Sequence, residues 1–76
     1  MSDPAEADRR LDAREIDGEP FSAIVAALEA LGPDERLLLV NSFEPEPLYG
    51  VLEDRGFAFE TTNPAPDRWH VVIEHA

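Results

Sequence analysis

The sequence contains no cysteine and no lysine, and all six of its basic residues are arginine. The absence of cysteine excludes a disulfide scaffold, a thiolate zinc site and a cysteine nucleophile. No run approaches the roughly 18 apolar residues that a membrane span needs, and no signal peptide opens the chain. We therefore expect a cytoplasmic protein with no membrane association and no cofactor.

The chain has an excess of negative charge. It contains 17 Asp and Glu residues and only 6 Arg, which gives a formal net charge of -11. Such a surface repels a phosphate backbone, so we expect no nucleic-acid partner. Two interpretations of the charge stay open. One is a salt-adapted, halophilic cytoplasm, in which salt screens the repulsion and weakly hydrated Arg replaces Lys. The other is an ordinary acidic protein rich in arginine.

Length and hydrophobic pattern predict one small domain. A chain of 76 residues buries only about 60 % of the surface that its unfolded form exposes, which leaves little room for a large cavity. Residues 1–10 lack apolar periodicity and are expected to form a disordered acidic tail, so that the domain occupies residues 11–76. Alternation predicts a first strand at residues 11–16, on which Leu11 and Ala13 share a face.

Two helices are predicted between the strands. The first begins at Pro20, which suits the first helical position, and ends at Gly32. Its apolar stripe consists of Phe21, Ile24, Val25, Leu28 and Leu31. The second begins within residues 44–47 and ends at Gly56, because two prolines fit in a first turn. Its apolar face consists of Leu48, Val51 and Leu52.

The remaining strands complete the fold. Residues 36–41 hold four consecutive apolar residues and predict a central strand, and residues 57–61 alternate as a half-buried strand does. Residues 63–67 contain two prolines and predict a turn before the last strand, residues 69–74. The order βαβαββ predicts an α+β fold: a two-layer sandwich with both helices on one face of a four-stranded mixed sheet.

Arg14 and Asn41 suggest a site where two neighbouring strands end. Both fall at the carboxyl ends of predicted parallel strands, where ligands of open α/β sheets bind. Together with the N–H groups that open the second helix, they could receive a small anion or carboxylate. The alternative is that Arg14 pairs with Asp12, Glu15 or Glu44 and that Asn41 caps a turn.

Phe43, Glu44 and Tyr49 surround the acidic, proline-containing turn before the second helix and could dock a protein partner. Alternatively, Phe43 fills the core and Tyr49 leans across its helix with the hydroxyl in water. His70 and His75 lie five residues apart, so one strand directs them to opposite faces. We therefore expect no metal site.

Five short motifs in the right order carry a resemblance to a known family. They are Leu11-Asp12-x-Arg14, Glu19-Pro20, Leu39-Val40-Asn41, Glu44-Pro45-x-Pro47-Leu48-Tyr49 and Trp69-x-Val71. Over residues 11–76 the chain resembles the domain-of-unknown-function family 2249, a relative of the TusA/SirA sulfur carriers. The resemblance implies a sheet in the order 1-2-4-3 with only the last strand antiparallel, and no established activity. Some members are joined to hemerythrin-like or iron–sulfur-repair domains, which hints at nitric-oxide or iron chemistry.

The chain departs from these relatives at two positions. Phe43 stands where the family usually has histidine, in a segment that usually reads Asn-Asp-His-Asp-Pro-x-Pro-Leu. Asp17 stands where the carriers have the cysteine that must become a persulfide, which a carboxylate cannot do. Asp17 is therefore expected to serve as a turn or helix-capping acid.

Together these features favour a non-enzymatic binding or adaptor module. It would act through the edge formed by Arg14, Asn41, Phe43, Glu44 and Tyr49, with a protein or a small anion as partner. The alternative is a small-molecule or metal-linked enzyme, or an accessory factor of redox, iron–sulfur or nitrogen-oxide metabolism. The absence of cysteine and of clustered histidines argues against that alternative. The pattern does not predict the oligomeric state.

Overall fold

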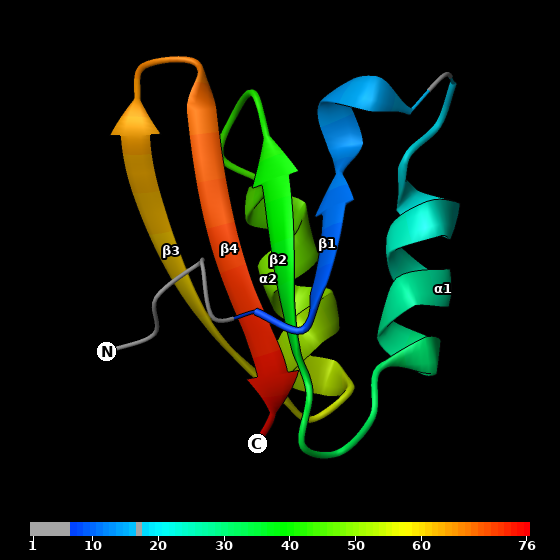
Figure 1. The fold of residues 1–76 in the computed structure, drawn as a ribbon. Helices are drawn as coiled ribbons and strands as arrows, with labels where there is room; N and C mark the ends of the chain where they lie inside the picture. Colours follow the sequence, from blue (N-terminus) through cyan, green and yellow to red (C-terminus); the bar gives the residue numbers. More distant parts are fainter. Residues whose placement is uncertain (1–6, 17) are drawn as a thin grey trace.

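The computed structural model describes residues 7–16 and 18–76, and within them the chain forms four strands, two α-helices and one short 3-10 helix. In chain order these are β1 (Arg9–Asp12), η2 (Ala13–Glu15), α1 (Phe21–Ala30), β2 (Arg36–Asn41), α2 (Glu46–Asp54), β3 (Phe57–Ala65) and β4 (Arg68–His75). Figure 1 shows the strands side by side in one sheet, with both helices against it.

The order of the strands is β1-β2-β4-β3. β1 and β2 are parallel, whereas β4 runs antiparallel to both β2 and β3. This arrangement confirms the predicted α+β fold and the 1-2-4-3 order. β2 and β3 run in the same direction, yet β4 lies between them, so the crossover through α2 does not join neighbouring strands.

The main core lies between the sheet and the helices. Leu37 and Leu39 of β2 face this layer, and the register places Ile73 and Val71 of β4 opposite them. The helices contribute four further buried residues, namely Ile24, Leu28, Leu48 and Leu52. Each fully buried aliphatic side chain stabilises the fold by about 1.5–3 kcal/mol relative to an exposed one. Alternate residues of β2 and β4 therefore face the helices, and the residues between them face the other side of the sheet.

The opposite face of the sheet is built from Leu38, Val40 and Val72, and we call it the helix-free face. These three residues are buried and form a second, smaller cluster, against which Ala7 packs. Around them the same face carries charged side chains, because Arg36 pairs with Glu74 across β2 and β4. This face combines a small apolar centre with ion pairs at its margin.

The first strand differs from the prediction. β1 begins at Arg9, two residues before the expected domain boundary, and the strand predicted at residues 11–16 ends at Asp12. Residues 13–15 form a single 3-10 turn instead, because the Asp12 carboxylate accepts the amide of Arg14 and caps it. Ala13 enters the core from that turn rather than from a strand. The first six residues of the expected tail, and Asp17, lie outside the described residues.

The first helix also begins later than predicted. Pro20 is its N-cap, and Phe21 is the first helical residue. Phe21 was expected in the buried stripe, yet its side chain is 45 % exposed, whereas Ile24, Leu28 and Leu31 are buried. The stripe was therefore assigned correctly at these three positions, whereas Val25 is only half-buried and Phe21, in the first turn, is exposed.

The third strand is longer than predicted. β3 continues to Ala65 through Asn63 and Pro64, and the expected turn at residues 63–67 shrinks to residues 66–67. The ladder is irregular between Thr62 and Ala65, and the Asn63 side-chain amide donates to the carbonyls of Ala65 (2.5 Å) and Arg68 (2.7 Å) there. β3 is an edge strand, which tolerates a proline without an N–H.

Candidate functional site

The strands β1 and β2 terminate, and the helices α1 and α2 begin, at the same end of the molecule (Figure 1). A small groove lies at this end. Its volume is about 160 Å³. It is lined by Pro20, Phe21, Ile24, Asn41, Phe43, Pro45, Pro47 and Leu48. These residues come from the start of α1, the end of β2 and the segment that leads into α2, so the fold assembles the groove from three parts of the chain.

The walls of the groove are almost entirely apolar. Phe21 and Phe43 are exposed, at 45 % and 61 %, whereas Ile24 and Leu48 are buried beneath them. A closed apolar cavity of about 150 Å³ holds one benzene ring. Sites for small molecules are larger, at about 300–1,000 Å³. The groove therefore has the size and chemistry to accept one large apolar side chain.

Local hydrogen bonds hold both helix starts that form the groove. The Glu19 carboxylate accepts the Ser22 amide (3.2 Å) and hydroxyl (3.0 Å) and also the Phe21 amide. Ahead of α2, the amide of Glu46 donates to the Glu44 carbonyl (2.9 Å) and the amide of Leu48 to the Pro45 carbonyl (3.0 Å). Pro45 and Pro47 have no N–H to satisfy. The groove walls are thus fixed by the backbone before any ligand is present.

Asn41 lies in the wall of the groove at the end of β2. Its side chain is buried, and Oδ1 accepts the amide of Ser42 at 2.9 Å. Trp69 pairs with it across the ladder from β4. Asn41 therefore turns the chain out of β2 toward Phe43, which is the turn-capping role weighed in the sequence analysis.

Arg14 lies apart from the groove. Its Nε and Nη2 atoms contact Asp12 at 2.9 and 2.7 Å, and its amide bonds the same carboxylate at 3.0 Å. The Asp12 side chain shares the helix-free face, since Asp12 pairs with Val40. The hydrogen bond from the Arg14 side chain holds the pKa of Asp12 far below its usual range. Arg14 is thus engaged by its neighbour and does not line the groove with Asn41 and Phe43.

Tyr49 and Glu44 form a separate group on the side of α2 that faces β3. The Tyr49 ring stacks on Phe59 with centroids 4.8 Å apart. Its hydroxyl donates to Glu44 Oε2 (3.3 Å) and accepts from the Thr61 hydroxyl (2.9 Å). Desolvation raises the pKa of Tyr49, and Glu44 adds to the rise. These contacts hold α2 against β3.

The two histidines point to opposite faces of the sheet, as predicted. His75 lies 3.0 Å from the Leu31 carbonyl through Nε2, and its ring packs on Phe57. His70 pairs with Val40 on the helix-free face, where burial and then the neighbouring arginines lower its pKa. Among residues 7–16 and 18–76, no group of three or more possible ligands is arranged to hold a metal ion.

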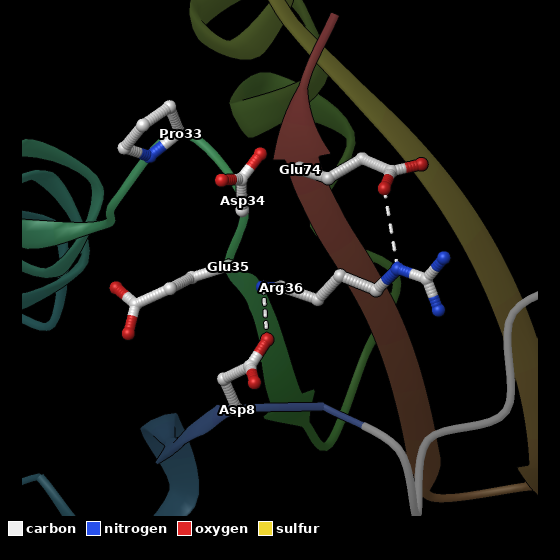
Figure 2. Close-up of a pocket in the computed structure, with 6 residues that line it drawn as sticks. All are labelled: Asp8, Pro33, Asp34, Glu35, Arg36 and Glu74. Carbon is white, nitrogen blue, oxygen red and sulfur yellow. Dashed lines mark hydrogen bonds and ion pairs between the residues drawn. The ribbon is translucent and has the colours of Figure 1, made fainter.

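A second hollow, of about 320 Å³, lies at the other end of the sheet (Figure 2). Arg36 stands at its centre: its amide donates to Asp8 (2.9 Å) and its Nε to Glu74 (3.2 Å). Glu35 accepts the Gly32 amide (2.7 Å) and the Arg9 Nε (3.0 Å). These bonds connect the first two strands, β4 and the loop after α1. The charged residues around this hollow are therefore best explained as a structural ion-pair network.

Sequence reasoning found part of the groove. It named Asn41 and Phe43, which the structure brings together, and it missed Phe21. The sequence did contain an indication for Phe21. A residue in the first turn of a helix has fewer neighbours in its own helix to cover it than a residue in the middle. Arg14, Glu44 and Tyr49 do not line the groove.

The fold and the groove define the protein as a small two-layer α+β domain with an apolar recess at its strand ends. Residues 10–75 match the model of the family described as "Uncharacterized conserved protein (DUF2249)", and the chain belongs to that family. No curated protein and no solved structure matches the chain. In the described part of the chain, neither helix has the length and apolar character needed to cross a membrane.

Proposed function

We propose that this protein is a non-enzymatic binding module that accepts one large apolar side chain of a partner protein in the groove between α1 and α2. The observation that carries the proposal is the pair of exposed phenylalanines, Phe21 and Phe43, beside a recess of about 160 Å³.

Exposed aromatic residues support a protein partner. Single apolar residues on a surface need no explanation, but two phenylalanines that border one apolar recess form a concave patch. Binding energy at protein interfaces concentrates in aromatic and aliphatic anchors that fill such pockets. The groove can thus act as the central pocket of a small interface.

The size of the groove argues against the enzymatic alternative. A small-molecule substrate needs about twice the volume and several convergent polar groups. Asn41 is the single polar residue among those that line the groove in the described part of the chain, and its Oδ1 is already bonded. The proposed kinship with sulfur carriers fits the location, since the carriers act at the start of the first helix.

Nuclear magnetic resonance can test the groove with a neutral probe, the blocked amino acid N-acetylphenylalaninamide. We expect the amide signals of Ile24, Asn41 and Leu48 to shift first. Phe43→Ala should weaken this binding about fivefold or more, because it removes an aromatic wall. Phe43→Leu should retain most of it. Since Phe43 is 61 % exposed, both variants should unfold within about 0.5 kcal/mol of the wild type.

Two results would contradict the proposal. One is a set of amide shifts confined to the turn at residues 66–67, with no change in the amide signals of the groove residues. The other is equal probe affinity for Phe43→Ala and the wild type, since the recess would then contribute nothing to recognition.

A further inference from the structure

Three glutamates are sequence neighbours of the residues that line the apolar groove. Glu19 precedes Pro20, and Glu44 and Glu46 alternate with the lining residues of the segment that leads into α2. We call these three the groove rim. Glu19 and Glu46 are exposed and Glu44 is half-buried. None of the described arginines lines the groove.

Four of the six arginines are held in ion pairs away from the groove rim. Arg9 pairs with Glu35 at 3.0 Å, and Arg36 pairs with Glu74 at 3.2 Å. Arg10 and Arg14 both contact Asp12, at 3.5 and 2.7 Å. In the described part of the chain, no ion pair reaches the three rim carboxylates. The Glu19 carboxylate is already bonded by the amides at the start of α1, and Glu44 accepts one hydrogen bond from Tyr49. The charge open to a partner therefore lies chiefly on Glu46 and Glu44.

The N–H groups at the two helix starts are already bonded within the protein, and those of α1 partly offset the charge of Glu19. Free N–H groups at a helix start would attract an anion. Here the amides of Phe21 and Ser22 are taken by Glu19, and those of Glu46 and Leu48 by carbonyls of the preceding turn. Pro47 has no amide hydrogen. Donors that would favour an anionic partner are thus occupied, which leaves the carboxylates to set the local potential.

We propose that the segment bound in the groove is cationic: a large apolar residue flanked by lysine or arginine, supplied by a different protein. This inference rests on the proposed function of the groove. The apolar residue fills the recess, and its basic neighbours reach Glu46 and Glu44. A second copy of this chain is a poor occupant, because each copy brings a formal charge of -11 and the two would repel each other.

The test uses three short peptides with one central phenylalanine, flanked by lysine, by serine or by glutamate. Affinities are measured in about 0.05 M salt, where screening is weak, from amide shifts and from the fluorescence of the single tryptophan, Trp69. Each exposed ion pair contributes roughly 1.4- to 5-fold in affinity. We expect the lysine peptide to bind about tenfold tighter than the glutamate peptide, with the serine peptide between them.

Two double variants that remove the same number of charges test whether the position of the charge determines the affinity for the lysine peptide. Glu44→Gln with Glu46→Gln removes two charges at the rim, and Glu53→Gln with Asp54→Asn removes two at the far end of α2. The rim variant should lose about 3- to 10-fold in affinity for the lysine peptide and little for the serine peptide. The far-end control should change both affinities less than twofold. Equal losses in the two variants would overturn the rim assignment, since net charge alone would then explain the effect.

The outcomes separate this inference from the proposed function. Groove shifts with equal affinity for all three peptides, or the tightest binding by the glutamate peptide, would overturn the cationic partner and leave the groove as a binding site. No groove shift with any peptide or with the neutral amino acid probe would overturn both.

Discussion

At the carboxyl end of β1, the Asp12 carboxylate accepts three bonds from Arg14, at 2.7 to 3.0 Å, while its own side chain is buried. This residue caps the 3-10 turn and orders Arg14 along the edge of the helix-free face. Asp12→Asn should lower the free energy of unfolding by about 1–2 kcal/mol, because it removes charge-assisted bonds that are partly screened by solvent. Urea denaturation measures this, with the exposed Asp34→Asn as a control that should change little.

The same residue gives a pH dependence of known sign. The Arg14 side-chain hydrogen bond lowers the pKa of Asp12 in the folded state, so the folded state holds the charged form more strongly than the unfolded chain does. The stabilisation is complete above the ordinary Asp pKa of about 4, declines as the pH falls below that value, and is lost only as the pH falls through the lower pKa of the folded state. Wild type and Asp12→Asn should therefore converge in stability toward pH 2. A constant difference from pH 7 to pH 2 would contradict this explanation.

Single residues were the least predictable part of the sequence. The helical spacing predicted Phe21 as buried, but spacing tells only which side of a helix a residue faces and not how far neighbouring elements cover it. For Arg14, the sequence offered both an anion site and a pair with Asp12, and only the fold shows the two-point contact. Such choices depend on distances of a few ångströms, which a residue pattern does not contain.

At the scale of elements, the side chain of Asn63 stabilises the tip of the β3–β4 hairpin, which the prediction of a turn from prolines did not include. Asn63 donates to the carbonyls of Ala65 and Arg68 where the ladder is irregular. Asn63→Ala should weaken the hairpin tip and cost about 1 kcal/mol. Amide hydrogen exchange near Thr62 and Arg68 should become faster, while exchange in β2 stays unchanged. The control Thr62→Ala, also exposed and on the same strand, should leave the tip protected; equal loss in both variants would exclude a special role for Asn63.

Most elements could be predicted because each carries a periodic apolar pattern. β2 matches its predicted residues, and α2 presents Leu48 and Leu52 to the core as expected. The two strands that differ most from the prediction are those where a short polar side chain competes with regular structure. Asp12 ends β1 early by bonding the backbone, and Asn63 prolongs β3 past a proline. Local bonds of this kind have no period, so hydrophobic patterning cannot reveal them.

At the scale of the whole molecule, pattern and family resemblance contributed different things. The βαβαββ order predicted a mixed sheet, but the position of β4 between β2 and β3 came from the resemblance, and the structure confirms it. The groove depends on that arrangement, since it joins residues from Pro20 to Leu48 at one end of the sheet. Sequence separation concealed that Phe21 and Phe43 meet: Phe21 was predicted in the core, and Phe43 was predicted either at a docking edge or in the core.

Salt should stabilise the whole molecule, because its charge is so one-sided. A net charge of -11 on 76 residues disfavours the compact state through many weak repulsions, and a domain this small has only a few kcal/mol of net stability. Sodium chloride screens those repulsions, and the Debye length falls to about 3 Å at 1 M. The melting temperature should therefore rise steeply from about 0.05 M salt.

The upper part of the salt range separates the two interpretations of the charge. Screening of an ordinary acidic surface is nearly complete well below 1 M, so its melting temperature becomes flat above about 0.3 M. A salt-adapted domain should continue to gain stability to about 3 M, since salt excluded from the surface also strengthens apolar burial. We predict the continued rise. Replacing Glu53 and Asp54 by Gln and Asn should reduce the low-salt part of the curve only, because that part alone reflects charge repulsion. A flat curve above about 0.3 M would identify an ordinary acidic domain.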